Sequence, residues 1–308
     1  MISVVIPVYN AQHSIYELVS QIIKVLSEHS PEIILVNDNS VDNSHQECIK
    51  IYNEFPHSIN YIKLRKNVGE HNSVMAGLRY AKGDWILIMD DDFQNPPEEA
   101  LKLVNYAKQN KYDVIYGNYI KKKHSFFRNL SSKINDLTAI YILKKPKNLY
   151  LSSFKCFNRS TLKEVVKYKG PNPYIDGLIL SITSNIGSLD LKHSPRKIGK
   201  SNYSLIKLIK LYVNISTNFS TLPIHIFSLL GITISLLSAI YGFLIIIERF
   251  INPEIPSGYS SIIVSIFFFS GIQLIFLGLI GEYLGKVLKN VNQQAPYHIG
   301  EEILKKEK

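Results

Sequence analysis

Cysteine and charge are both scarce in this chain of 308 residues. Its two cysteines, Cys48 and Cys156, are too few for a disulfide scaffold and lack the spacing of a metal site, which indicates reduced thiols in a cytosolic environment. Charged residues make up 19% of the sequence and hydrophobic residues 46%. These proportions exclude a disordered chain, a collagen-like fibre and a coiled-coil rod.

Two common signals are also absent. The N-terminal MISVVIPVYN has no basic region and no cleavage site, so we do not expect a signal peptide. The first apolar run leads into PVYNAQ and not into G-x-G-x-x-G, which argues against a dinucleotide-dependent dehydrogenase. Acidic residues number 25 against 35 basic ones, and the net charge of +10 indicates an anionic partner.

Two long runs towards the C-terminus contain no Asp, Glu, Lys or Arg, namely residues 224–247 and 260–281. As helices they would be about 36 and 33 Å long. The hydrocarbon core of a bilayer is about 30 Å thick, so we predict two transmembrane helices. A pair of buried core helices is the alternative.

Basic residues flank this pair of runs on its outer sides, whereas the connection between the runs, residues 248–259, holds a single arginine. The flanking residues are Arg196, Lys197, Lys200, Lys207 and Lys210 before the first run, and Lys286, Lys289, Lys305, Lys306 and Lys308 after the second. An excess of Lys and Arg marks the cytoplasmic side of a membrane. The basic excess lies beside the runs and no nucleic-acid motif is present, so we expect membrane lipids and no nucleic acid among the partners.

The predicted organisation is therefore a cytoplasmic domain over residues 1–200, an amphipathic juxtamembrane segment over 201–223, a membrane hairpin over 224–281 and a cytoplasmic tail over 282–308. This describes a multi-pass protein of the cell's inner (cytoplasmic) membrane with both termini in the cytoplasm.

The first ninety residues alternate between β-rich and helical patterns. Strands are predicted over residues 2–8, 32–36, 59–64 and 85–89, and helices over 14–26, 42–52 and 73–81. This alternation predicts an α/β, Rossmann-like fold with a mostly parallel sheet. Ligands of such sheets bind beyond the carboxyl ends of the strands. Polar clusters at residues 9–10, 37–40 and 90–92 follow three of the strands, and we expect them to converge on one crevice.

The segment DDDFQNPPEE, which begins at Asp90, follows a buried strand directly. Three adjacent carboxylates repel one another, and a bound divalent cation offsets this repulsion. Residues i and i+2 of an extended segment point to the same side, so Asp90 and Asp92 can share one ion. Mg²⁺ and Mn²⁺ prefer such oxygen ligands. The alternative is an N-cap cluster for a helix that starts near Pro96, and both roles can hold at once.

Four segments in order resemble family 2 glycosyltransferases with a GT-A fold: IPVYN, ILVNDNSVDNS, KNVGEHNSVMAGLRYAKGD and IMDDDFQNPPEE. Followed by two apolar runs, they resemble in particular the polyprenyl-phosphate glycosyltransferases, a group that includes dolichyl-phosphate mannose synthase and the bacterial undecaprenyl-phosphate sugar transferases. The resemblance covers nearly the whole chain. It implies a GT-A catalytic domain followed by a two-helix transmembrane hairpin.

For the donor, a nucleotide-diphosphate sugar, the resemblance implies a site at the polar clusters. The nucleotide would contact Pro7, Tyr9, Asn10, Asp38, Asp90 and Asp91, and the metal ion, Mg²⁺ or Mn²⁺, would be held by Asp90, Asp92 and Gln94, with Asp92 also catalytic. UDP is the favoured nucleotide, with GDP and dTDP as alternatives. Asp38 would accept a hydrogen bond from the base, although it could equally form an Asx-turn that caps the next helix.

For the acceptor, a polyprenyl phosphate, the resemblance assigns the phosphate to Arg128 and Ser132 in FFRNLSS and to Arg196 in PRKIGKSNY, with both arginines catalytic. A guanidinium group matches phosphate oxygens in a bidentate manner. The alternative is contact with anionic lipid headgroups, which we prefer for Lys121–Lys123, Lys207 and Lys210. The chain departs from the family pattern at three places. Ser153 stands where the pattern has an acid, Asn118-Tyr119 stands where it has a basic residue, and Asn202 stands where it has a lysine.

The implied reaction is an inverting transfer of a sugar to the lipid phosphate at the cytoplasmic membrane face, for surface glycan synthesis or modification. A phosphate acceptor is already an anion, so the enzyme's task is placement rather than base catalysis. One alternative is transfer to a sugar hydroxyl of a lipid-linked glycan, with Asp176 as the base, a residue that could equally cap a helix. Another is a non-catalytic membrane protein that binds nucleotide sugars. The oligomeric state is open, a homo-oligomer included.

Overall fold

The computed structural model divides the chain into two units, residues 1–204 with 293–308, and residues 205–292. It describes residues 1–119, 140, 145–147, 149–191, 229, 231–234, 236–237, 240, 243–244, 247, 251, 258–291 and 295–306. The predicted phosphate-binding residues Arg128, Ser132 and Arg196, and the departure at Asn202, lie outside the described residues.

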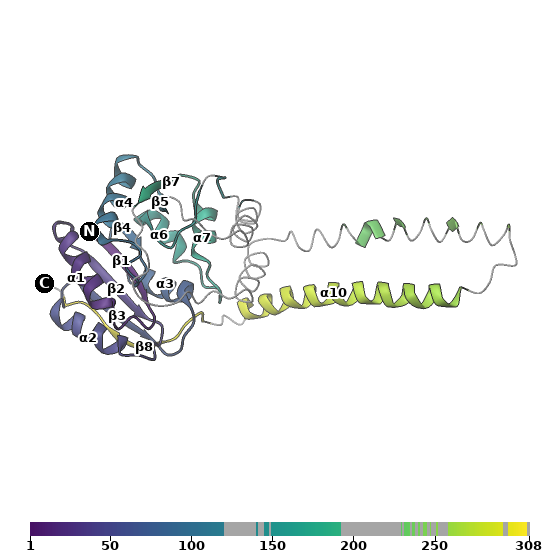
Figure 1. Ribbon diagram of the computed structural model, residues 1–308, viewed down its shortest axis with the longest axis horizontal. Helices are drawn as coiled ribbons and strands as arrows, with labels where there is room; N and C mark the ends of the chain where they lie inside the picture. Colours follow the sequence, from purple (N-terminus) through teal and green to yellow (C-terminus); the bar gives the residue numbers. More distant parts are fainter. Residues whose placement is uncertain are drawn as a thin grey trace. The chain divides into compact units, whose positions relative to one another are not determined.

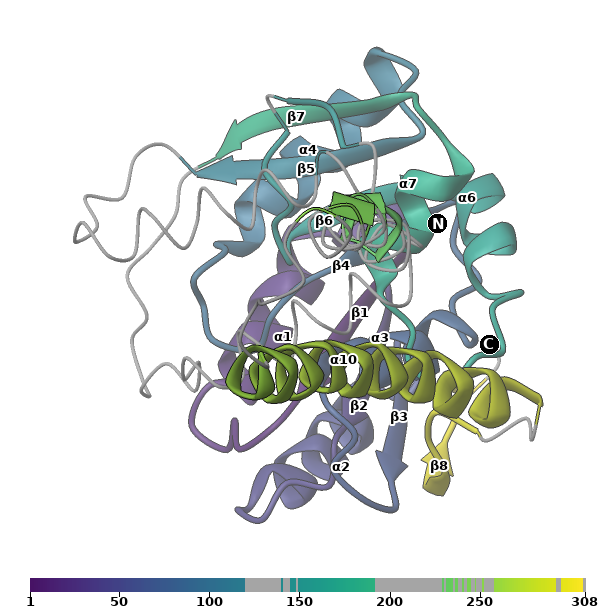
Figure 2. The ribbon, with the colours of Figure 1, turned by 90° about the vertical axis from the view of Figure 1, so that its right-hand side faces the viewer.

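An eight-stranded sheet forms the first unit, in the order β7-β5-β6-β4-β1-β2-β3-β8 (Figures 1 and 2). The strands are β1 (Ile2–Val8), β2 (Glu32–Asn37), β3 (Ile59–Leu64), β4 (Trp85–Ile88), β5 (Val114–Tyr119), β6 (Lys155–Asn158), β7 (Ile186–Leu191) and β8 (Ile299–Ile303). β1 pairs in parallel with β2 and β4, and β2 with β3. β6 and β8 run antiparallel to their neighbours. The expected α/β fold with a mostly parallel sheet is confirmed.

Helices cover both faces of this sheet (Figure 1). The helices that pack on one face are α1 (Ile15–Val25), α2 (Ser44–Glu54) and α4 (Pro97–Gln109), and those on the other are α3 (Glu70–Leu78), α6 (Arg159–Val165) and α7 (Ile175–Ile182). A short 3₁₀ turn, η1 (Ser27–His29), follows α1. α3 approaches the sheet closely at Gly77, where an added Cβ would lie 2.5 Å from Val5 Cγ1. Because side chains are buried on both faces, the strands are nearly continuous apolar runs.

The predicted strands in the first ninety residues are confirmed to within one residue. Two helix starts differ from their predictions. α2 begins at Ser44 rather than 42, because the Asp42 carboxylate accepts the Ser44 N–H at 3.0 Å and so ends the loop. α3 begins at Glu70 rather than 73, directly after Gly69, whose φ of 87° belongs to the left-handed region. β8, in the tail, was not predicted at all.

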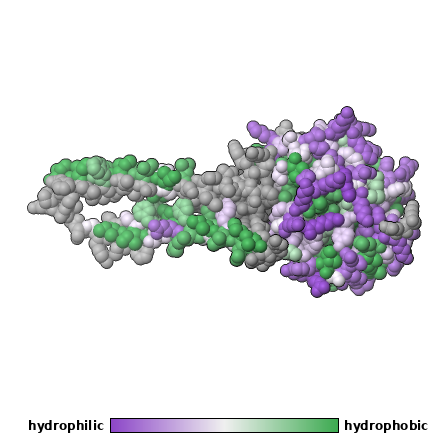
Figure 3. Space-filling model, turned by 180° about the vertical axis from the view of Figure 1, so that it is seen from behind, coloured by the Kyte–Doolittle hydropathy of each residue, from purple (hydrophilic) through white to green (hydrophobic). Residues whose placement is uncertain are grey.

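The second unit contains α10 (Tyr259–Val291), within which the second predicted membrane span lies. Its segment Phe268–Gly285 is long and apolar enough to cross a membrane, by length and composition. The described residues from 229 to 251 are also helical. Figure 3 shows hydrophobic residues over the surface of this unit. Among the described residues, exposed large apolar side chains lie almost entirely between Leu229 and Val291, the exceptions being Met1, Tyr9, Val41, Tyr150 and Leu304.

Candidate active site

The carboxyl ends of β1, β2 and β4 bring the three predicted polar clusters together. The backbone N–H of Tyr9 donates to Asp91 Oδ2 at 3.0 Å, which joins the first cluster to the third. The N–H of Asn10 donates to Ser40 Oγ at 3.1 Å, which joins the first to the second. The expected convergence is therefore present. Tyr9 is 42% exposed, so its ring is free to stack on a planar ligand.

The acidic loop after β4 is the most charged part of this edge. Asp90 Oδ2 accepts a hydrogen bond from Ser153 Oγ, and Asp92 Oδ1 accepts the Gln94 N–H at 3.0 Å in an Asx-turn. Phe93 between them has a φ of 60°. The serine at a position where the family pattern has an acid thus donates a hydrogen bond to Asp90, whereas an acid there would add a further like charge.

Burial and mutual repulsion perturb these carboxylates. Burial is the main reason why the pKa of Asp90 is raised to about 7. The neighbouring charges of Glu70 and Asp92 add to the rise, and the hydrogen bond from Ser153 opposes it. Burial, followed by the charges of Asp90 and Asp92, raises the pKa of Asp91 to about 7. A carboxylate cluster with raised pKa values is the electrostatic signature of a functional site and is stabilised by a cation.

The alternative role of these acids, as caps of α4, is not what the structure shows. The N-cap of α4 is Pro96, with Pro97 at the first helical position and no side-chain cap hydrogen bond. Within the described residues, no three His, Cys, Asp or Glu side chains are arranged as a complete metal site. A Mg²⁺ ion usually takes one or two carboxylates and completes its shell with substrate and water oxygens, and the metal role of Asp90 and Asp92 stays a prediction.

Asp38 contacts the loop that precedes α3 and does not form the turn before α2. Its carboxylate is 3% exposed and accepts the N–H groups of Val68 and Gly69, each at 2.8 Å. Burial raises the pKa of Asp38, while these hydrogen bonds and one from Ser73 oppose the rise. The Asx-turn before α2 is made by Asp42, whose Oδ1 accepts the Ser44 N–H at 3.0 Å. Asp38 thus holds the loop that leads into α3.

Asp176, the candidate base, is buried in an ionic network. It is 6% exposed, pairs with Lys155 Nζ and accepts the hydroxyl hydrogen of Tyr116 at 2.9 Å. Lys155 is 3% exposed and lies 5.2 Å from the centre of the Tyr116 ring. α7 has Tyr174 as its N-cap and no side-chain cap hydrogen bond, so Asp176 does not cap it. The capping role of Asp176 is therefore wrong, whereas its role as a base stays a prediction for a carboxylate that forms a buried ion pair with Lys155.

Lys155 and its contacts were missed by sequence reasoning. Its charge lies within the otherwise apolar segment SFKCF, and a lysine inside a buried strand is the signal that could have revealed it. Its partners could not be inferred, because Tyr116 and Asp176 come from β5 and α7 and are distant in the sequence.

Comparison with known proteins shows the family of this chain. The profile described as Glycosyl transferase family 2 matches residues 3–166. The chain belongs to glycosyl transferase family 2. It is accordingly a glycosyltransferase, and the acidic loop after β4 and the Tyr9–Asn10 turn form its candidate active site.

Curated relatives of this glycosyltransferase align over almost its full length. An undecaprenyl-phosphate 4-deoxy-4-formamido-L-arabinose transferase from Yersinia pestis bv. Antiqua (strain Angola) is 31% identical over 303 residues, covering 97% of this chain and 92% of the relative. A protein of the same name from Yersinia pseudotuberculosis serotype O:3 (strain YPIII) matches equally well, with 31% identity and the same coverage.

A solved structure supports the fold. Glucosyl-3-phosphoglycerate synthase from Mycobacterium tuberculosis, in complex with Mn²⁺, UDP and phosphoglyceric acid, is similar with a TM-score of 0.54 and 15% identity. The match covers 70% of this chain and 76% of that one. The similarity confirms the α/β, GT-A-like architecture.

Proposed function

We propose that this protein transfers a sugar, with inversion, from a nucleotide-diphosphate sugar to a polyprenyl phosphate at the cytoplasmic face of the membrane. The observation that carries the proposal is that the acidic loop Asp90 to Asp92 meets the Tyr9 turn. This loop does not cap α4, and the ring of Tyr9 is exposed. The relatives named as undecaprenyl-phosphate sugar transferases, which align over 97% of the chain, support the acceptor class.

The donor is best accommodated at the ends of β1 and β4. Tyr9 offers a stacking surface for the base, Pro7 and Asn10 are its neighbours in the chain, and the loop held by Asp38 follows the next strand but one, β3. Each oxygen of Asp38 accepts one N–H group, and a carboxylate has about four acceptor sites, so Asp38 keeps the capacity to accept a hydrogen bond from the base. UDP is the favoured nucleotide. The similar structure of glucosyl-3-phosphoglycerate synthase holds UDP with Mn²⁺, so a UDP-sugar and Mn²⁺ are the first probes to try.

Asp90 and Asp92, with Gln94 as a further ligand, would hold Mg²⁺ or Mn²⁺. When bound, the ion supplies a Lewis acid that offsets negative charge on the departing diphosphate. The protein's part is to keep the carboxylates in place: Ser153 orients Asp90, and the Asx-turn to Gln94 orients Asp92.

The acceptor is proposed to be a phosphate rather than a hydroxyl. A hydroxyl acceptor would need a base, and Asp176 is committed to Lys155 and Tyr116. A lipid phosphate is already an anion, so positioning by Arg128, Ser132 and Arg196, as the family resemblance implies, is sufficient.

The fold also supports the proposed membrane topology. β8 belongs to the same folded unit as residues 1–204, although the chain reaches it only after residues 205–292. A chain that leaves this unit and returns to it must cross a membrane an even number of times. α10 is long and apolar enough for one crossing. In our proposal it makes that crossing and residues 224–247 make the second, which keeps both termini cytoplasmic.

Chelation tests the proposal. Isolated membranes with added undecaprenyl phosphate are incubated with radiolabelled UDP-, GDP- or dTDP-sugars, with and without EDTA. We expect one labelled donor to transfer its sugar to lipid, EDTA to reduce the rate by about a hundredfold or more, and excess Mn²⁺ or Mg²⁺ to restore it. Transfer that is unaffected by EDTA would refute the metal role, and failure of every donor would refute the proposed class of donor.

A further inference from the structure

The C-terminal segment, residues 297–306, is an integral part of the catalytic sheet. Its strand β8 runs antiparallel to β3, with Lys63 opposite Glu301 and Leu64 opposite Ile299. An edge strand without a partner exposes a row of N–H and C=O groups. β8 therefore completes the β3 edge with residues that follow the apolar unit 205–292 in the chain.

The beginning of this segment fixes Arg65, the first residue after β3. The backbone N–H of Arg65 donates to the His298 carbonyl at 2.9 Å, and its Nε donates to the Ile299 carbonyl at 3.2 Å. A Cβ added at Gly300 would lie 3.2 Å from Arg65 Cγ, so strand and side chain are in close contact. Both the backbone and the side chain of Arg65 are thus held by the C-terminal segment.

Arg65 is also the first residue of the loop that contacts Asp38. Val68 and Gly69 donate their N–H groups to the Asp38 carboxylate, and α3 begins at the next residue, Glu70, whose charge acts on Asp90. The left-handed conformation of Gly69 gives the loop a particular shape. That shape is held by Asp38 at one end and by the C-terminal segment, through Arg65, at the other.

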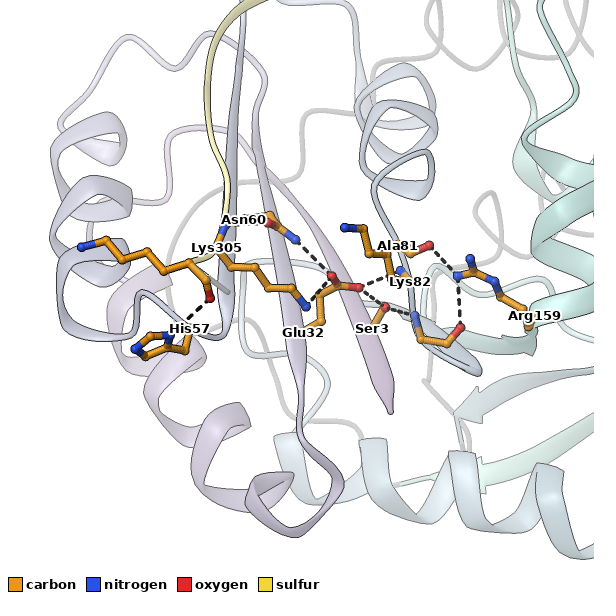
Figure 4. Close-up of polar contacts among 10 residues, drawn as sticks. Ser3, Glu32, His57, Asn60, Ala81, Lys82, Arg159 and Lys305 are labelled. Carbon is orange, nitrogen blue, oxygen red and sulfur yellow. Dashed lines mark hydrogen bonds and ion pairs between the residues drawn. The ribbon is translucent and has the colours of Figure 1, made fainter. Parts of the chain in front are cut away.

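A buried ion pair anchors the end of the segment (Figure 4). Lys305 Nζ lies 2.8 Å from Glu32 Oε1, and Glu32 is fully buried. Ser3 Oγ, at 2.5 Å, and the Lys82 N–H, at 2.7 Å, donate to the other oxygen. Burial alone would raise the pKa of Glu32, but these hydrogen bonds, with that from Lys305 the strongest, outweigh burial and lower it. Glu32 is therefore ionised at neutral pH, and Lys305 supplies positive charge to it.

Side chains from helical regions hold the middle of the segment. The Tyr80 hydroxyl, just after α3, donates to Glu302 Oε2 at 2.5 Å, and the Tyr52 hydroxyl of α2 donates to the Leu304 carbonyl at 3.1 Å. Tyr297 is 8% exposed and its ring lies 5.4 Å from the Arg79 guanidinium. The segment is thus tied to both faces of the sheet edge.

We propose that the C-terminal segment is a positioning element of the donor site, acting through Arg65 on the loop of residues 65–69, with Lys305 as its anchor. A short edge strand forms and opens as one cooperative unit, so weakening the Lys305 end also loosens the Arg65 end. The inference rests on the proposed function only in taking the loop as the border of a donor site.

Hydrogen exchange of the ligand-free, full-length protein tests the link directly. We compare wild type with Lys305→Met, with Lys305→Arg, which keeps the charge, and with Lys306→Met as the matched control, because Lys306 is exposed and contacts Pro56 and His57 through its backbone. We expect amides in residues 299–303 and 65–69 to exchange about tenfold faster in Lys305→Met than in wild type. In Lys305→Arg and Lys306→Met we expect these amides to exchange as in wild type. Adding Glu32→Gln to Lys305→Met should restore most protection, because a neutral amide needs no counter-ion.

Loosening of residues 299–303 without any change at 65–69 would overturn the proposal, as would equal effects in Lys305→Met and Lys306→Met. Kinetics give an independent readout of positioning. For Lys305→Met we expect the KM for the donor to rise about five- to tenfold, with kcat and the KM for polyprenyl phosphate within about twofold of wild type. Equal changes in all three constants would indicate a merely structural role.

The two proposals fail in different ways. If wild type uses no nucleotide sugar, the proposed function is wrong, and the exchange experiment still decides whether the C-terminal segment controls the loop. If wild type is active and the exchange at residues 65–69 does not respond, only the positioning role is wrong.

Discussion

Asp92→Asn is expected to reduce kcat for sugar transfer by about 10²- to 10³-fold, the effect typical of losing one electrostatic contact to a transition state. Asparagine retains an oxygen that can accept the Gln94 N–H, so the Asx-turn is kept while the negative charge is lost. The measurement is kcat at saturating donor and acceptor over a range of Mn²⁺ concentrations.

The matched control is Glu98→Gln, which removes an exposed carboxylate from the first turn of α4, six residues further along. We expect its kcat to stay within about twofold of wild type, because surface substitutions away from a site have small effects. If Asp92→Asn retains more than about a third of wild-type activity while folding normally, Asp92 has no place in the catalytic chemistry.

The second large effect is expected on stability. Lys155→Met should destabilise the catalytic unit by about 3–5 kcal/mol, because it leaves Asp176 buried without its cation. For a unit of this size that corresponds to a fall in Tm of roughly 10 °C. Thermal unfolding of the detergent-purified protein, followed by circular dichroism, measures it, with Lys163→Met on the exposed side of α6 as the control.

The partner residue makes this prediction more specific. Adding Asp176→Asn to Lys155→Met should recover much of the lost stability, since replacing both members of a buried ion pair is far less costly than removing one. Additive losses in the double variant would show that the two side chains do not act as a pair. Asp176→Asn that leaves Tm unchanged but abolishes turnover would instead return Asp176 to the role of a base.

Several features of the fold and site follow from the sequence for local reasons. Strands β1 to β4 are short apolar runs whose pattern depends on nearby residues, and their parallel arrangement follows from the helices between them. Once the strands are parallel, the polar residues that end β1, β2 and β4 must share one edge. That is why the approach of Tyr9 to Asp91 could be expected.

Other features depend on contacts between distant residues and could not be predicted in this way. The segment 299–303, IGEEI, has no strong strand pattern, and its pairing is decided by an open edge at β3 and a buried acid at Glu32. Asp38 was expected to act on a ligand or on the next helix. Its carboxylate also accepts an N–H group from a loop 30 residues away, which no spacing rule relates to it, and its action on a ligand stays a prediction.

The choice between phosphate and hydroxyl acceptors is tested most directly by comparing undecaprenyl phosphate with undecaprenol, which lacks the phosphate. The purified enzyme is given labelled donor and Mn²⁺ with each lipid, and the lipid product is isolated and analysed by mass spectrometry. We expect labelled product only from undecaprenyl phosphate, with the sugar attached to the phosphate oxygen. Transfer to undecaprenol at a comparable rate, or a product whose sugar is attached to another sugar's hydroxyl, would contradict transfer to a lipid phosphate.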